Sequence, residues 1–101
     1  MKENKIQEIQ ILEQNLQNIL FQKQSFQIEI NEIQASLKEL ENSGEEVYKI
    51  IGQLMLRTEK QKVKKELLEK KEILEIHLKT VEKQEKNLTE KVEKLREELA
   101  K

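Results

Sequence analysis

The residue types that could carry out bond-making chemistry are few in this chain. His77 is the single histidine, and there is no cysteine or aspartate to complete a metal site or a catalytic triad with it. Gly44 and Gly52 are not followed directly by Lys-Ser or Lys-Thr, so no phosphate-binding loop is predicted. The glutamates alternate with lysines, which is typical of a solvated helix face. The sequence therefore predicts a protein that is not an enzyme and has no metal site and no cofactor.

Charge and hydropathy narrow the class of partner. The 19 basic and 20 acidic residues nearly cancel, and the small basic cluster at Lys60, Lys62, Lys64 and Lys65 is soon interrupted by acids. Such a cluster is more typical of a solvated face than of a nucleic-acid contact. No apolar run approaches the ~20 residues of a membrane span, and the first residues lack the apolar core of a signal peptide. We expect a cytoplasmic protein that binds neither nucleic acid nor membrane.

The elements that position any binding residues are predicted to be long helices. The chain is 39% charged and 36% hydrophobic, with no proline. This is too polar for a packed globule but suits helices with a narrow apolar stripe. We expect one domain: a helix over residues 1–42, a linker and β-hairpin over 43–58, and a second helix over 59–101.

Each predicted helix carries a heptad repeat. Asn42, Ser43 and Gly44 follow the first helix, and Gly44 suits a left-handed C-terminal cap. Thr58 with Gln61 fits a capping box at the start of the second helix. The first seam is expected at Lys5, Ile9, Leu12, Leu16, Ile19, Lys23, Phe26, Ile30, Ile33, Leu37 and Leu40, and the second at Lys64, Leu67, Lys71, Leu74, Leu78, Val81, Glu85, Leu88, Val92, Leu95 and Leu99.

The two repeats fit each other as an antiparallel coiled coil. Pairing residues whose numbers add to 104 places an a position opposite every d position and puts the turn at Gly52. Lys23 then faces Val81, and Glu85 faces Ile19, each charge reaching water along its stem. A register shifted by a whole heptad satisfies the pattern as well.

The segment between the helices, Val47–Thr58, is predicted to form a single β-hairpin. In the same register Tyr48 faces Leu56 and Ile50 faces Leu54. A lone apolar hairpin is marginal in water and has two open edges, so we expect it to pair with other hairpins in an oligomeric sheet or barrel. The residues assigned to this oligomerisation are Val47, Tyr48, Ile50, Ile51, Gly52, Leu54, Met55 and Leu56.

The order of these segments resembles the β-type subunit of prefoldin. The most specific part of the resemblance is Val47-Tyr48-Lys49 followed by Gly52 and Leu54, set between a Gln-rich helix and a Lys/Glu-rich helix. The single hairpin is similar to the β-type, because α-type subunits have two. The fold class implied is mainly α: an antiparallel two-helix coiled coil with one β-hairpin that contributes to an oligomeric β-barrel.

The resemblance also implies a function and partners. It implies a hexamer of two α-type and four β-type subunits, made of an α-type partner and further copies of this chain. It implies an ATP-independent holdase that binds unfolded client proteins and delivers them to a group II chaperonin. The alternative from another class is a structural coiled-coil scaffold or tether that oligomerises through the hairpin.

The client-binding residues are expected at the free ends of the two helices. Both chain ends lie there, where helices fray and apolar residues lose neighbours. The candidates are Ile6, Ile9, Ile11, Leu12, Val92, Leu95 and Leu99. Most of them also fit seam packing, whereas Ile6 and Ile11 lie off the seam. Phe21, Ile28, Ile73 and Ile76 lie at outward positions and are expected either to form an apolar strip or to be scattered surface residues.

Overall fold

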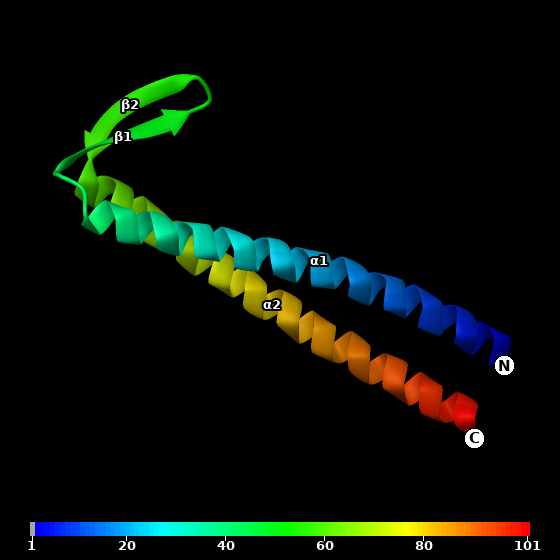
Figure 1. Cartoon of the computed structure of the whole chain (residues 1–101). Helices are drawn as coiled ribbons and strands as arrows, with labels where there is room; N and C mark the ends of the chain where they lie inside the picture. The colour runs from blue at the N-terminus through cyan, green and yellow to red at the C-terminus, as the bar shows by residue number, and fades with distance from the viewer. Residues whose placement is uncertain (1) are drawn as a thin grey trace. The chain divides into compact units, whose positions relative to one another are not determined.

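Two long helices and one hairpin make up the fold. The structure, a computed structural model, describes residues 2–101. Helix α1 (Lys2–Glu41) is followed by strands β1 (Glu46–Ile51) and β2 (Leu54–Glu59) and by helix α2 (Lys60–Ala100), and the two helices are antiparallel (Figure 1). This confirms the predicted fold: mainly α, with a β-hairpin between the helices of an antiparallel coiled coil.

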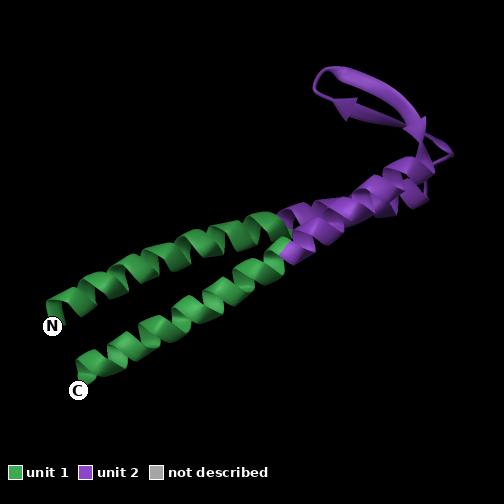
Figure 2. Ribbon diagram, turned by 180° about the vertical axis from the view of Figure 1, so that it is seen from behind, with its two compact units in different colours: residues 1–27, 77–101 green, residues 28–76 purple. Residues whose placement is uncertain are grey.

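The chain divides into two compact units, which are described separately. The terminal unit comprises residues 1–27 and 77–101, and the hairpin unit comprises residues 28–76 (Figure 2). Within the terminal unit the two helical segments run side by side and carry both chain ends at the same end. The hairpin unit contains the hairpin and the helical segments that lead into it.

The burial of α1 follows the predicted heptad. All of its expected seam positions are buried or half-buried, and the other described residues of the helix are exposed. Ile30 and Ile33 are the most deeply buried, at 4% and 6% exposure. The prediction for the first seam is therefore confirmed, because a 40-residue helix with one narrow apolar stripe has only one face that it can bury.

The seam of α2 is confirmed from Leu67 onward but not at its beginning. Lys64 is exposed, and Val63 is half-buried in its place. The strict heptad would place Lys64 in the seam, three residues before Leu67. Val63, four residues before Leu67, takes that place, so the seam keeps an aliphatic side chain there. Burying a methyl-bearing side chain costs less than burying an ammonium group, so the local helical phase follows the valine.

The junction between α1 and the hairpin differs from the prediction. Gly44 does not adopt positive φ, so it is not a left-handed cap. The helix ends instead in a tightened turn, where the amides of Asn42 and Ser43 donate to the carbonyls of Glu39 and Leu40, each at 3.1 Å. The Lys60 ammonium group then donates to the carbonyls of Glu41 and Ser43, at 3.2 and 3.1 Å, and so ties the start of α2 to the end of α1.

The predicted capping box is also wrong. Thr58 lies inside β2, and α2 begins at Lys60, one residue later than a cap at Thr58 allows. The amide of Lys60 is satisfied by the backbone instead, because it donates to the Glu45 carbonyl at 3.0 Å. The hairpin therefore leads directly into the helix.

The hairpin turn is where the sequence placed it, but the strand register is shifted by one residue. Gly52 has φ of +58° and Gln53 does not have positive φ, which fits a two-residue type II′ turn with glycine at its first central position. Ile50 therefore pairs with Met55, and Tyr48 with Arg57, rather than with Leu54 and Leu56. A one-residue slip exchanges the faces of one strand, so the predicted facing pairs are wrong.

Candidate functional site

The first face of the hairpin combines large apolar side chains with charges near its base. This tyrosine face consists of Tyr48, Ile50 and Met55 with Glu46, Arg57 and Glu59. Ile50 is 69% exposed and Met55 65%. Glu46 and Glu59 are direct cross-strand partners, an unfavourable pairing of like charges, and Arg57 forms an ion pair with Glu46 on the diagonal.

The second face of the hairpin is more continuously aliphatic. This valine face consists of Val47, Ile51, Leu54 and Leu56 with Lys49 and Thr58. Ile51, Leu54 and Leu56 are exposed, while Val47 is half-buried at the hairpin base, in a shallow recess that it shares with Leu40, Val63 and Leu67. Both faces of the ribbon are thus apolar and open.

One ion pair ties the valine face to α2. The Lys49 ammonium group lies 2.9 Å from a carboxylate oxygen of Glu66. The hydrogen bond from Lys49, followed by its positive charge, holds the pKa of Glu66 below its ordinary value. Both groups are solvent-accessible, so the pair orients the ribbon without contributing much stability.

The predicted oligomerisation residues are all in the ribbon, and most are exposed. Tyr48, Ile50, Ile51, Leu54, Met55 and Leu56 each have about half or more of their side chain open to solvent. Among residues 2–101 the sheet has two strands, so each strand has one edge without a strand partner. The geometry is compatible with the expected pairing between hairpins, which stays a prediction here.

The predicted client-binding residues fall into two groups in the terminal unit. Ile6 and Ile11 are 47% and 60% exposed, as their positions off the seam predict. Ile9 and Val92 are 9% and 5% exposed and pack in the seam. The remaining candidates are half-buried: Leu12, Leu95 and Leu99. Of these seven candidates, only Ile6 and Ile11 present an apolar side chain to solvent without any movement of the helices.

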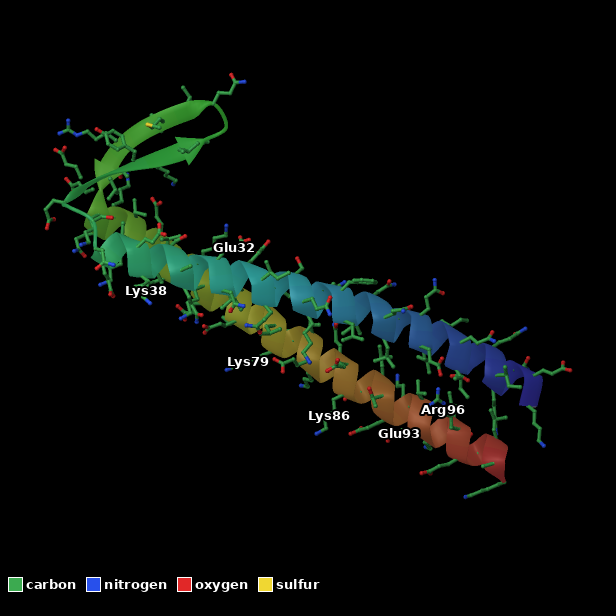
Figure 3. All side chains as sticks on the ribbon, viewed as in Figure 1. Glu32, Lys38, Lys79, Lys86, Glu93 and Arg96 are labelled. Atoms are coloured by element: carbon green, nitrogen blue, oxygen red, sulfur yellow. The ribbon has the colours of Figure 1, made fainter. Side chains whose placement is uncertain are left out.

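Ion pairs cross the seam of the terminal unit. Lys5 contacts Glu98 at 3.2 Å. Arg96 of α2, labelled in Figure 3, forms an ion pair with Glu13 of α1. Lys23 and Glu85, each expected to lie against an aliphatic residue, instead contact each other at 3.2 Å. The two charged seam positions lie in adjacent layers of the predicted register, so a lysine side chain can bridge them and neutralise both.

His77 has a partner that the sequence did not reveal. It lies at a flanking position and is exposed, as expected of a surface residue, but its ring stacks on Phe26 of α1 with centroids 5.7 Å apart and planes inclined by 17°. The residue is therefore part of helix packing in the terminal unit.

Exposed apolar residues are more numerous on the helices than the sequence predicted. Phe21, Ile28, Ile73 and Ile76 are exposed as expected. Leu20 and Leu68 are exposed too, at 46% and 47%, and were missed. Both follow a seam residue directly, so the signal that could have found them is an aliphatic residue at the flanking e position.

No chemistry-bearing cluster emerges from the described part of the chain. Residues 2–101 contain no group of three or more histidine or acidic side chains placed to hold a metal ion. Neither described helix is long and apolar enough to cross a membrane. What the arrangement offers is apolar contact surface, at the hairpin and near the chain ends.

Comparisons with known proteins agree on one family. The family described as "Prefoldin subunit" matches residues 3–101. The chain is 41% identical over 88 residues to the prefoldin subunit beta of Pyrobaculum islandicum, a match that covers 85% of this chain and 70% of that protein. It is 40% identical over 89 residues to the prefoldin subunit beta of Thermococcus onnurineus, covering 86% and 77%. The crystal structure of the prefoldin beta subunit from Thermococcus strain KS-1 is similar with a TM-score of 0.91 and 36% identity, covering 97% of this chain and 88% of that one.

Proposed function

Because this chain belongs to the prefoldin subunit family, we propose that it is the β-type subunit of a cytoplasmic, ATP-independent holdase. The family is one of non-enzymatic chaperones, and a beta subunit in it implies assembly with alpha subunits. We propose further that the chain assembles in four copies with two α-type subunits, binds unfolded clients near its chain ends, and delivers them to a group II chaperonin.

The observation that carries the assembly is the exposure of the hairpin on both faces. A two-stranded ribbon with Ile50, Ile51 and Leu54 in water is not independently stable. Pairing with other hairpins covers the faces and both open edges together. A barrel built from several such ribbons leaves the helices free to project from it.

The observation that carries client binding is the exposure of Ile6 and Ile11 in the terminal unit. Two isolated aliphatic side chains bind an unfolded chain weakly. Several copies held in one assembly raise the effective concentration, so that an extended client engages several ends at once. Burial of apolar surface drives such binding, and release follows from weak individual contacts without nucleotide hydrolysis.

The experiment is an aggregation assay on the assembled protein. The chain is co-expressed with an α-type subunit, and the mass of the assembly is measured by native mass spectrometry. A chemically unfolded client is then diluted into the assembly with and without ATP. We expect a mass of six chains and equal protection in both conditions. A correctly assembled hexamer that gives no protection would favour the scaffold alternative.

Delivery is tested separately with a group II chaperonin. A client held by the assembly is mixed with the chaperonin, and transfer is followed by energy transfer between dyes on the client and on the chaperonin. We expect client held by the assembly to reach the chaperonin faster than free client, diluted from denaturant, binds to it. Equal rates would remove delivery from the proposal and leave holding intact.

A further inference from the structure

The two flanks of the terminal unit differ in charge. One flank carries a shallow groove lined by Asn15, Asn18 and Gln22 of α1 and Gln84 and Asn87 of α2, around Ile19 and Leu88. We call it the amide groove. A groove on the other flank is lined by Leu16 and Leu20 of α1 and by charged residues of α2, among them Lys86 and Glu93, which are labelled in Figure 3. In a chain that is 39% charged, a groove without a single charged side chain is a distinct environment.

The amide groove has an apolar floor and a polar rim. Ile19 is 8% exposed and Leu88 is half-buried, so the floor is part of the seam. The rim residues are exposed. An apolar floor with convergent neutral polar groups suits a ligand that combines apolar and amide surface.

The rim amides are free to bind a ligand. Each Asn or Gln side chain offers a carbonyl acceptor and an NH₂ donor. Within residues 2–101, none of the five rim side chains has a hydrogen-bond partner in the protein. Each rim side chain therefore offers both a donor and an acceptor to solvent. A peptide group, with one N–H and one C=O, can bond to both.

The groove continues the surface proposed for client binding. Asn18 follows Ile11 by one heptad, so the two share one face of α1, about 10 Å apart along the helix. The rim from Asn15 to Gln22 also extends about 10 Å, the length of roughly three residues of extended chain. A client segment that contacts Ile11 with a side chain can therefore lay its main chain along the groove.

We propose that the amide groove binds the main chain of an extended, unfolded polypeptide. This inference rests on the proposed holdase function and names what the client presents there: peptide N–H and C=O groups rather than particular side chains. A neutral rim neither attracts nor repels charged client side chains, so the groove accepts clients of any charge. Recognition of the backbone gives sequence tolerance, while Ile6 and Ile11 supply apolar contact.

The test compares two sets of substitutions in the assembled hexamer. The groove variant is Asn18→Ala, Gln22→Ala and Asn87→Ala. The matched control is Gln10→Ala, Gln17→Ala and Gln24→Ala, three exposed amides outside the groove that share another face of α1. Alanine has high helix propensity, so both variants retain the helices. Far-UV circular dichroism and native mass spectrometry verify fold and assembly.

The probe is an unstructured, uncharged, fluorescent peptide of about ten residues and a twin with methylated backbone nitrogens. Fluorescence anisotropy measures the dissociation constant of each. We expect the groove variant to bind the unmethylated peptide about three- to tenfold more weakly, and the control less than twofold more weakly. Methylation is expected to weaken binding to the wild type by a similar factor and to have no further effect on the groove variant.

Three results would overturn the inference. One is unchanged affinity in the groove variant. Another is an equal penalty for methylation in the wild type and the groove variant. A third is a changed assembly mass, which would assign the groove to packing between copies. Loss of peptide binding on Ile6→Ser with Ile11→Ser, together with no effect of the groove variant, would leave the proposed function standing and remove only the groove.

Discussion

The hairpin and the terminal unit use aliphatic residues in opposite ways. In the hairpin Ile50, Ile51 and Leu54 point into solvent on both faces of a thin ribbon. In the terminal unit most aliphatic residues pack in a seam, and only a few, such as Ile6 and Ile11, remain exposed. A dense exposed apolar ribbon is suited to permanent assembly, whereas sparse exposed residues suit weak, reversible contact. Under the proposed function, this difference assigns assembly to the hairpin and client binding to the chain ends.

The largest expected effect comes from placing charges on the apolar faces of the hairpin. Ile50→Glu with Leu54→Glu places one carboxylate on each face of the ribbon. Burying two unpaired carboxylates between hairpins is strongly unfavourable, so the assembly should dissociate while helical content stays high. Native mass spectrometry checks this. The control is Ile73→Glu, at an isoleucine of α2 that is also more than half exposed, and it should leave the hexamer mass unchanged.

A second prediction separates packing from binding near the chain ends. Ile9→Ala removes a buried seam residue and should lower the free energy of unfolding by about 2 kcal/mol. Ile11→Ala, two residues away and exposed, should change it by less than about 0.5 kcal/mol but weaken client binding. Thermal unfolding and an aggregation assay on both variants make the comparison. Equal destabilisation by the two would contradict the observed burial.

A third prediction concerns the two glycines. Gly52→Ala forces a residue with a Cβ atom into φ of +58°, and should destabilise the assembly by about 1–2 kcal/mol for each affected chain. Gly44→Ala is the matched control, because Gly44 has no positive φ and no atom lies within 4 Å of an added Cβ. It should be neutral or stabilising by up to about 1 kcal/mol. Thermal unfolding of the two assemblies tests the difference.

The smallest expected effect is the pH dependence of the Lys49–Glu66 pair. Because folding holds the pKa of Glu66 below 4.5, its contribution to stability is present above that pH and is lost as the pH falls through the lower, folded value. Glu66→Gln should therefore lower stability slightly above pH 4.5 and have less and less effect as the pH falls and Glu66 becomes protonated. The difference between variant and wild type in denaturant midpoint, measured from pH 7 to pH 3, should shrink as the pH falls. A constant difference would mean that the pair does not act through ionisation.

The sequence predicted the elements that depend on periodicity. The seam of α1 follows the heptad at each position, and the turn falls at Gly52, because a single apolar stripe and a single glycine between aliphatic runs leave few alternatives. Exposure of Ile6 and Ile11 was predicted for the same reason. These features depend on local pattern alone.

The predictions that were wrong, such as the strand register and the start of the second seam, depend on turn geometry and side-chain chemistry, which hydrophobic periodicity does not describe. The strand register shifted by one residue because the turn takes two central residues, Gly52 and Gln53. Val63 replaced Lys64 in the seam because desolvating a lysine costs more than a change of helical phase. Contacts between long side chains of different helices, such as the stacking of His77 on Phe26, also depend on the three-dimensional packing and not on the heptad pattern. The amides of the amide groove were likewise visible in the sequence only as a Gln-rich surface.

The central claim is that the hairpin assembles and the chain ends hold the client. The most direct measurement is protection of an unfolded client by hexamers that carry Ile6→Ser with Ile11→Ser. The account predicts an assembly of unchanged mass with clearly weaker protection, because the substitutions remove the two exposed aliphatic side chains assigned to client binding without entering the seam. Full protection by an intact variant hexamer would contradict it.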